Sequence, residues 1–144
     1  MNMLGLVPPI IWGFALIGLR YGLYYNTLRG YKRRINSLSS EIEAFKADFL
    51  EKLVGFNQPD VSGPLKELIN QPATYLAFNR QVEAALKQVF FKDLNKASES
   101  ELKDYSRVAS SLRMQVMDYN RLALGKYDRR TARLLGFKPI AVPA

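Results

Sequence analysis

Few side chains in this sequence can do chemistry beyond hydrogen bonding and charge. The 144 residues include no cysteine and no histidine, which excludes disulfides, thiolate nucleophiles, the usual general base and the commonest metal ligands. Three close groups of acids remain: Glu41/Glu43, Glu99/Glu101 and Asp118 near Asp128. None has a spacing typical of catalysis or metal binding, and no glycine-rich phosphate loop or nucleophile motif is present. We therefore expect no enzyme activity, no metal and no cofactor.

The basic residues gather at the two ends of the chain. Its 21 Lys+Arg and 13 Asp+Glu give a formal net charge of +8. Residues 1–35 hold five bases and no acid, residues 126–144 hold five bases and one acid, and the 11 bases and 12 acids between them nearly cancel. The first cluster is Arg20, Arg29, Lys32, Arg33 and Arg34, and the basic tail is Lys126, Arg129, Arg130 and Arg133, followed by Lys138. Such clusters attract nucleic acids, anionic lipids or acidic proteins.

A long uncharged stretch precedes the first basic cluster. Residues 3–19, MLGLVPPIIWGFALIGL, carry no charge, and as a helix they would span roughly 26 Å, close to the ~30 Å hydrocarbon core of a bilayer. Tyr21 and Tyr24, with Trp12 as a weaker marker, are typical of a membrane interface. No basic leader or small-residue cleavage site indicates a signal peptide. We predict a transmembrane anchor over residues 1–27, with its prolines in the first turn.

The bases after the anchor predict its orientation. Because Arg29, Lys32, Arg33 and Arg34 follow the stretch directly, the positive-inside rule places the N-terminus outside and the remaining chain in the cytoplasm, a single pass through the inner membrane. Arg20 lies within the predicted anchor, where it must either reach the interface or pair with the membrane helix of another subunit. Tethering to lipid makes nucleic acid an unlikely partner for either cluster.

Beyond the anchor the apolar residues recur at helical spacing. One heptad stripe predicts a single helix that continues the anchor to about residue 56; its members are Leu28, Tyr31, Ile35, Leu38, Ile42, Phe45 and Phe49. A loop over residues 57–64, a short helix at 65–70 and a helical run at 75–89 follow. A second long stripe comprises Leu102, Tyr105, Ala109, Leu112, Val116, Tyr119 and Ala123. Asp128 is expected to cap a last short helix, which Gly136 ends.

These elements predict an all-α fold, because no segment alternates with period two. The N-terminal transmembrane helix continues into an antiparallel helical bundle over residues 28–125, and a basic short helix and tail occupy 126–144. Three full-length helices would leave the tail far from the membrane. If residues 65–70 count as a fourth element, the tail returns toward the lipid.

Two Tyr-Asn pairs stand at related places, Tyr25-Asn26 with Leu28 after the anchor and Tyr119-Asn120 on the last long helix. The second pair precedes the ending Gly136, Phe137, Lys138 and Pro139. The pattern resembles the LemA family at both ends of the chain, whereas the middle departs from it, with Glu51 where that family has proline. The resemblance implies a bacterial single-pass membrane protein with a cytoplasmic helical bundle and no enzyme activity.

The Tyr-Asn pairs have two interpretations. Either the amides and rings fix the register of packed helices, or the pairs belong to a docking surface for another protein. The expected function is a non-enzymatic membrane-anchored scaffold or assembly protein. It would contact other membrane or membrane-associated proteins, including further copies of itself. The alternative is an organiser of anionic lipid that uses the two basic clusters.

Overall fold

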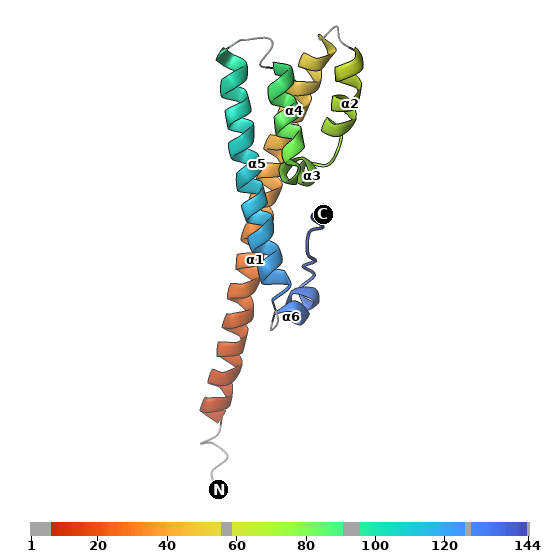
Figure 1. The fold of residues 1–144 in the computed structure, drawn as a ribbon. Coiled ribbons are helices and arrows are strands. Elements are labelled where there is room, and N and C mark those ends of the chain that lie inside the picture. Colours follow the sequence, from red (N-terminus) through yellow and green to blue (C-terminus); the bar gives the residue numbers. More distant parts are fainter. Residues whose placement is uncertain (1–6, 56–58, 91–95, 126–127, 144) are drawn as a thin grey trace.

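The structure, a computed structural model, describes residues 7–55, 59–90, 96–125 and 128–143. Within these ranges the chain forms helices, turns and an extended C-terminal segment and contains no strand, so the all-α prediction is confirmed. The two long helices, α1 (Val7–Val54) and α5 (Lys96–Ala123), run antiparallel and side by side (Figure 1). Three shorter helices cover the end far from the N-terminus: α2 (Pro59–Ile69), α3 (Ala73–Phe78) and α4 (Arg80–Phe90). The last helix, α6 (Arg129–Leu134), lies where α5 ends.

The seam between α1 and α5 is the core that the heptad spacing predicts. Leu28, Ile35, Ile42 and Phe49, each seven residues from the next, are all at most 3% exposed. The second predicted stripe on α5, Leu102 to Ala123, is buried throughout. Apolar side chains at heptad spacing pack into one another along nearly parallel helix axes, as in a coiled coil. The predicted continuous first helix is confirmed over the 48 residues of α1.

The covering helices differ from the sequence prediction in two places. Residues 59–64, predicted as loop, belong to α2, because Pro59 suits a first helical position and burial of Leu65 and Ile69 fixes the helix against the core. The predicted run at 75–89 is divided into α3 and α4 at Asn79. Asn79 is extended, with φ −92° and ψ 97°, and its side-chain Oδ1 accepts a hydrogen bond from the Gln81 N–H. Such a local turn competes with a continuous helix.

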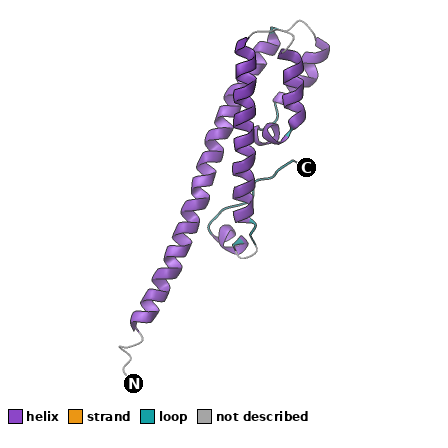
Figure 2. Cartoon of the chain, turned by 60° about the vertical axis from the view of Figure 1, so that its left-hand side comes forward, coloured by secondary structure: helices purple, strands orange, loops and turns teal. Residues whose placement is uncertain are grey.

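We call the first part of α1 (residues 7–23) the arm. Its N-terminal part projects beyond all other described elements (Figure 2), whereas its last turns, from Ile17 on, lie beside α6. Its large apolar side chains are exposed by 53–72%: Ile10, Ile11, Trp12, Phe14, Leu16, Ile17, Leu19 and Leu23. Among the described helices, none is both long enough and apolar enough to cross a membrane, so the transmembrane part of the prediction is unsupported.

Candidate functional site

The basic tail lies beside the arm, one of the two placements that the sequence left open. The short helices α2 to α4 reverse the chain, so that α5 runs back along α1 toward the arm (Figure 1). The tail helix α6 then lies next to the segment of α1 that carries Arg20 and Tyr24. Segments about a hundred residues apart in the sequence therefore form one junction.

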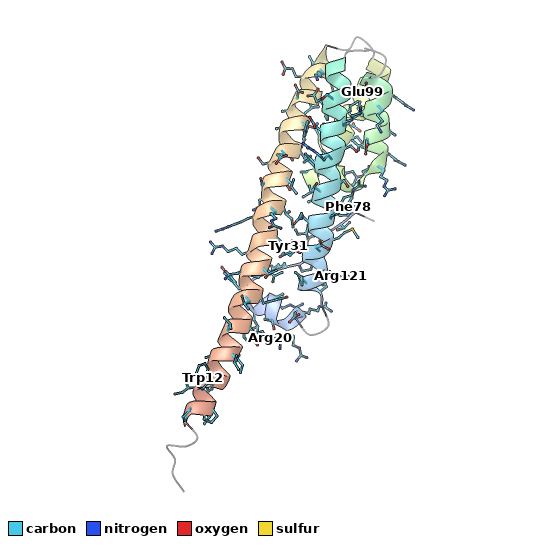
Figure 3. The ribbon with its side chains drawn as sticks, turned by 90° about the vertical axis from the view of Figure 1, so that its left-hand side faces the viewer. Trp12, Arg20, Tyr31, Phe78, Glu99 and Arg121 are labelled. Atoms are coloured by element: carbon cyan, nitrogen blue, oxygen red, sulfur yellow. The ribbon has the colours of Figure 1, made fainter. Side chains whose placement is uncertain are left out.

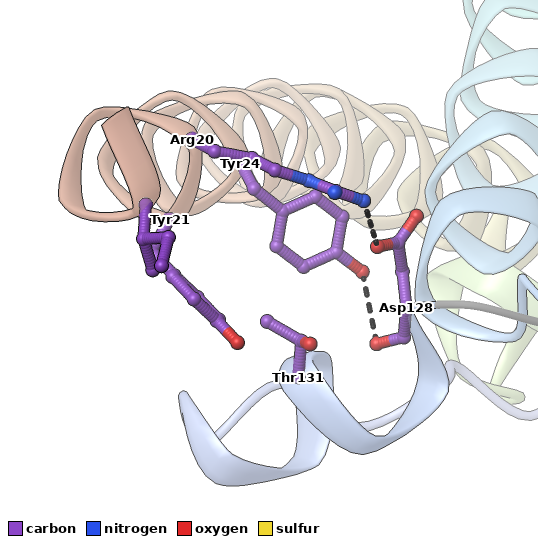
Figure 4. Close-up of a pocket in the computed structure, with 6 residues that line it drawn as sticks. Arg20, Tyr21, Tyr24, Asp128 and Thr131 are labelled. Atoms are coloured by element: carbon purple, nitrogen blue, oxygen red, sulfur yellow. Dashed lines mark hydrogen bonds and ion pairs between the residues drawn. The ribbon is translucent and has the colours of Figure 1, made fainter. Parts of the chain in front are cut away.

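A pocket of about 500 Å³ opens at this junction, between the arm and α6 (Figure 4). Four residues of α1 and two at the start of α6 line it: Ile17, Arg20, Tyr21, Tyr24, Asp128 and Thr131. Its size lies within the roughly 300–1,000 Å³ of typical small-ligand sites. The pocket, which we call the junction pocket, is the candidate site.

Tyr24 lines the junction pocket and ties α1 to the end of α5. Its hydroxyl donates a hydrogen bond to the Leu122 carbonyl oxygen at 2.9 Å and lies 3.4 Å from the Asp128 carbonyl oxygen. The sequence suggested that Tyr24 faces lipid, but its half-buried side chain ties α1 to the end of α5. This correction follows from the end of α5 and the start of the tail, whose carbonyl oxygens offer the hydroxyl a partner that a bilayer lacks.

Arg20 and Asp128 form the charged side of the junction pocket. The Arg20 guanidinium lies 3.9 Å from the Asp128 carboxylate, and the two side chains are 79% and 34% exposed. The sequence predicted that Arg20 reaches the interface or pairs with another subunit; within its own chain, the structure gives it one loose partner, Asp128. A pair this exposed contributes little to stability, about 0–1 kcal/mol.

Asp128 was also expected to cap α6: it stands at the N-cap position, but its side chain does not cap the helix. Its backbone, with φ −110° and ψ −8°, is in the helical region and not the extended region typical of a capping residue. Its side chain makes no capping hydrogen bond. The carboxylate is instead turned toward Arg20 (Figure 4).

Exposed bases lie on both elements of the junction, on α6 and on the part of α1 that follows the arm. Arg129, Arg130 and Arg133 of α6 are exposed, as are the four bases of the first cluster on α1, Arg29, Lys32, Arg33 and Arg34. Trp12 projects from the arm, well away from the bundle, and Arg20 lies beside α6 (Figure 3). Tyr21 is exposed at the mouth of the junction pocket. Lys126 lies outside the described residues.

The second Tyr-Asn pair holds the C-terminal tail. The Tyr119 hydroxyl donates to the Lys138 carbonyl oxygen at 2.8 Å. The Asn120 side chain donates to the Ile140 carbonyl oxygen and accepts from the Ile140 N–H, both at 2.8 Å. Residues predicted to fix helix register thus fix the tail against α5, a partner that the sequence did not indicate.

Gly136 and Phe137 complete this arrangement. Gly136, with φ +81°, ends α6: its N–H donates to the Arg133 carbonyl and the Phe137 N–H donates to the Ala132 carbonyl, the two bonds of a Schellman turn. The turn directs Phe137 into the core, where its ring contacts that of Tyr25 edge-on at 5.5 Å between centroids. Leu28 is fully buried next to this contact region of α1, whereas Asn26, Lys138 and Pro139 are exposed.

Three of the acids singled out in the sequence form ion pairs with lysines. Glu43 pairs with Lys46 at 3.2 Å and Glu99 with Lys103 at 3.4 Å, and Glu101 pairs with Lys52 across α1 and α5. Within the described residues, no three acidic side chains are grouped so that they could hold a metal ion.

The junction pocket offers binding groups more than reactive ones. It presents one cation, one carboxylate and the hydroxyls of Tyr21 and Thr131. None of its lining residues forms the hydrogen-bonded pair of nucleophile and base that covalent catalysis requires. Comparison of the chain with models of protein families, with curated proteins and with solved structures finds no match. Its function is therefore inferred from the arm, the junction pocket and the bases around them.

Proposed function

We propose that this protein is a non-enzymatic helical scaffold, attached to the membrane by its arm, whose bundle contacts partner proteins at the cytoplasmic face. The observation that carries this proposal is the exposure of large apolar side chains along the whole arm. Exposing them to water is costly, because burial of one such side chain is worth about 1.5–3 kcal/mol.

The distribution of these apolar side chains around the helix indicates that lipid buries them. Consecutive helical residues point about 100° apart, so Ile10, Ile11 and Trp12 alone face three directions. A helix that is apolar on every face is stable only when it is surrounded. One partner helix would cover one face, whereas lipid covers all of them. The uncharged stretch also continues in the sequence from Val7 back to Met3.

The bases that follow the arm support one orientation of the chain across the membrane. Exposed Arg29, Lys32, Arg33 and Arg34 follow the arm on α1, and bases on this side of a membrane segment are typical of the cytoplasmic face. The resemblance of both Tyr-Asn pairs to the LemA family supports the same topology. We therefore propose that the N-terminus lies outside and the bundle inside.

Exposed methionines on α5 support a role in assembly. Met114 and Met117, one helical turn apart on α5, are each 61% exposed. Methionine side chains are flexible and polarizable, and therefore suit contacts with protein partners of varied shape. Other membrane proteins, and further copies of this chain, are the proposed partners.

Membrane attachment is tested by paired lysine substitutions in the full-length chain. Phe14→Lys with Leu16→Lys should release the protein from membranes at alkaline pH, because each lysine in the hydrocarbon core costs roughly 2.5–3.5 kcal/mol. Met114→Lys with Met117→Lys is the matched control, since these side chains are similarly exposed. The control should stay with the membrane. Release of the wild-type chain, or cleavage of its C-terminal tail by protease outside intact cells, would contradict the proposal.

The assembly role is tested by native mass spectrometry after gentle detergent extraction and by crosslinking within membranes. We expect defined complexes whose abundance falls in the Met114→Lys, Met117→Lys variant. A homogeneous monomer without crosslinked products, in wild type and variant alike, would contradict a scaffold.

A second candidate function is favoured by the position of α6. Its exposed Arg129, Arg130 and Arg133 lie at the same end of the bundle as Arg20, where they would meet headgroups if the arm enters lipid. Each near-surface base contributes about 1 kcal/mol of attraction to anionic lipid. The chain would then organise anionic lipid instead of proteins, and binding to anionic vesicles would be its main activity.

A further inference from the structure

We propose that the junction pocket binds a zwitterionic phosphoethanolamine headgroup, with the phosphate on Arg20 and the primary ammonium on Asp128. The proposal deepens the membrane attachment proposed above and rests on it for the source of the ligand, a membrane lipid. It is carried by the arrangement of one cation from α1 and one carboxylate from the start of α6, which lie side by side, 3.9 Å apart, in the lining of the pocket (Figure 4).

The charges of the pocket match a ligand that carries both signs. Arg20 and Asp128 give the lining residues no net charge, so a purely anionic headgroup would meet the Asp128 carboxylate as well as the guanidinium. At 3.9 Å the two groups are too far apart for a direct hydrogen bond. A ligand whose phosphate and ammonium are joined by a short ethylene link can bind each of them, and charge-assisted hydrogen bonds of this kind are the strong ones.

The free capacity of Asp128 favours a primary ammonium. Its carboxylate makes no capping bond to α6, and its only ion pair with a described residue is the loose one to Arg20. An ammonium donates hydrogen bonds to such a carboxylate, whereas the quaternary nitrogen of choline has no hydrogen to donate.

The remaining lining residues fit the rest of a phospholipid. The hydroxyls of Tyr21 and Thr131 lie at the pocket and can donate to phosphate oxygens. Tyr24 already donates its hydroxyl to Leu122 and so shapes the wall without serving the ligand. Ile17, on the arm side of the pocket, is exposed and apolar, so the acyl chains would continue along the arm.

The test uses the full chain in maltoside detergent, which contains neither phosphate nor amine, and water-soluble headgroup probes. Methyl resonances of Thr131 and Ile17 are followed by NMR during titration with glycerophosphoethanolamine, glycerophosphoglycerol, glycerophosphocholine and inorganic phosphate. Both methyl resonances should shift during titration with glycerophosphoethanolamine. The dissociation constant from these shifts should be at least about tenfold lower than for the other probes, which is the effect of one charge-assisted hydrogen bond. The methyl of Ile42, which is fully buried in the core, should not move.

Three single substitutions distinguish the pocket from general charge. Asp128→Asn and Arg20→Gln should each weaken binding of glycerophosphoethanolamine about tenfold or more. Arg133→Gln removes an exposed base of α6 that does not line the pocket and should leave the affinity unchanged. Equal binding of inorganic phosphate or glycerophosphoglycerol, or a loss in Arg133→Gln as large as in Arg20→Gln, would overturn the proposal in favour of a nonspecific anion surface.

Failure of this proposal is separable from failure of membrane attachment. If no probe shifts the Thr131 methyl while the wild-type chain remains with membranes at alkaline pH, the headgroup site is wrong and the attachment stands. If glycerophosphoethanolamine binds while the chain is released from membranes, the site stands and its ligand is a free phosphoethanolamine compound. Native mass spectra of the chain extracted from vesicles of mixed lipids should retain phosphatidylethanolamine in preference to phosphatidylglycerol, and this retention should fall in Asp128→Asn.

Discussion

Asn120 and Asn26 occupy the same place in the two Tyr-Asn pairs, yet the structure uses them differently. Asn120 makes two 2.8 Å hydrogen bonds to the backbone of Ile140, whereas Asn26 is exposed on α1. We predict that Asn120→Ala lowers the free energy of unfolding by about 1–2 kcal/mol, because two half-buried backbone groups lose their partner. Urea denaturation measures the loss, and hydrogen exchange of the Ile140 amide should accelerate.

Asn26→Ala is the matched control for this prediction. The change removes no contact that the structure gives the tail, and alanine is the better helix former. Stability should therefore change by no more than about 0.5 kcal/mol. Equal losses in the two variants would mean that the tail contact contributes nothing beyond helix propensity.

Tyr105 gives the fold a dependence on alkaline pH. Its ring packs against Phe45 and Phe49, and its buried hydroxyl has no hydrogen-bond partner among the described residues. Burial, reinforced by the charge of Glu83 and opposed by that of Arg113, raises the pKa of Tyr105 from 10.0 to about 12. Because the unfolded chain loses this proton first, Tyr105 stabilises the fold below pH 10, and that contribution falls between pH 10 and pH 12 by about 3 kcal/mol.

Tyr105→Phe should remove this part of the pH dependence. At neutral pH we expect the variant to be as stable as wild type or more stable, because it deletes an unsatisfied buried hydroxyl while keeping the ring. Its unfolding free energy should fall less steeply than that of wild type above pH 10, with all other titrating groups unchanged. Parallel curves for the two chains over pH 9–12 would contradict the assignment to Tyr105.

Single residues show where prediction from sequence stops. Both Tyr-Asn pairs were recognised as important, but the partners of Tyr119 and Asn120 are backbone groups of residues 138 and 140. A backbone carbonyl is present at every residue, so residue type carries no signal of which one will be used. Arg20 and Asp128 are similarly 108 positions apart, and nothing in their local sequences relates them.

Among the elements, the end of α6 depends most on one residue type. Gly136 is left-handed, with φ +81°, in the turn that sends Phe137 to Tyr25. We predict that Gly136→Ala costs about 1–2 kcal/mol, the penalty of a left-handed conformation for a residue with a Cβ. Urea denaturation would measure this loss of stability. The near-ultraviolet circular dichroism signal of the Tyr25–Phe137 contact should also weaken.

Gly30→Ala is the opposite case on α1. A Cβ at Gly30 would meet nothing within 4 Å, and the residue lies inside a regular helix. Alanine should therefore stabilise the chain by about 0.5–1 kcal/mol. If Gly30→Ala lowered the free energy of unfolding as much as Gly136→Ala, backbone conformation would not be what distinguishes the two glycines.

The long helices could be predicted from the sequence because their apolar spacing repeats over several turns. Seven-residue spacing from Leu28 to Phe49 fixes both the extent and the buried face of that part of α1. The covering helices followed less well because their boundaries depend on single local choices. Pro59 was interpreted as part of a loop although it also suits a helix start, and the Asn79 side chain interrupts a pattern that apolar spacing alone would continue.

For the whole molecule, the position of the tail follows from the number of times the chain reverses. With α2 and α4 as separate elements, α5 runs toward the arm and α6 lies at the junction (Figure 1). The sequence left this placement open, because a short helix at 65–70 could be counted or ignored. The consequence is that bases from both ends of the chain lie at one end of the bundle.

This gathering of charge predicts how the whole molecule distinguishes lipids. Replacing Arg129, Arg130 and Arg133 with glutamine should reduce the preference of the full chain for anionic over neutral vesicles by roughly 100-fold, at about 1 kcal/mol per base. Taking the ratio of the two affinities cancels the contribution of the arm, which is common to both vesicles. The preference should also weaken as salt screens the charges.

The control for this prediction removes the same charge elsewhere. Lys66, Lys87 and Lys103 lie on α2, α4 and the first half of α5, the elements at the end of the bundle opposite the arm (Figure 1). Their replacement with glutamine changes the net charge equally but should leave the ratio of affinities nearly unchanged, because a surface potential decays within about 10 Å at 0.1 M salt. If the two triple variants lose preference equally, net charge governs binding and α6 does not face the lipid. If only the α6 variant loses it, the end of the bundle that carries the arm, the junction pocket and the tail is the end that meets the membrane.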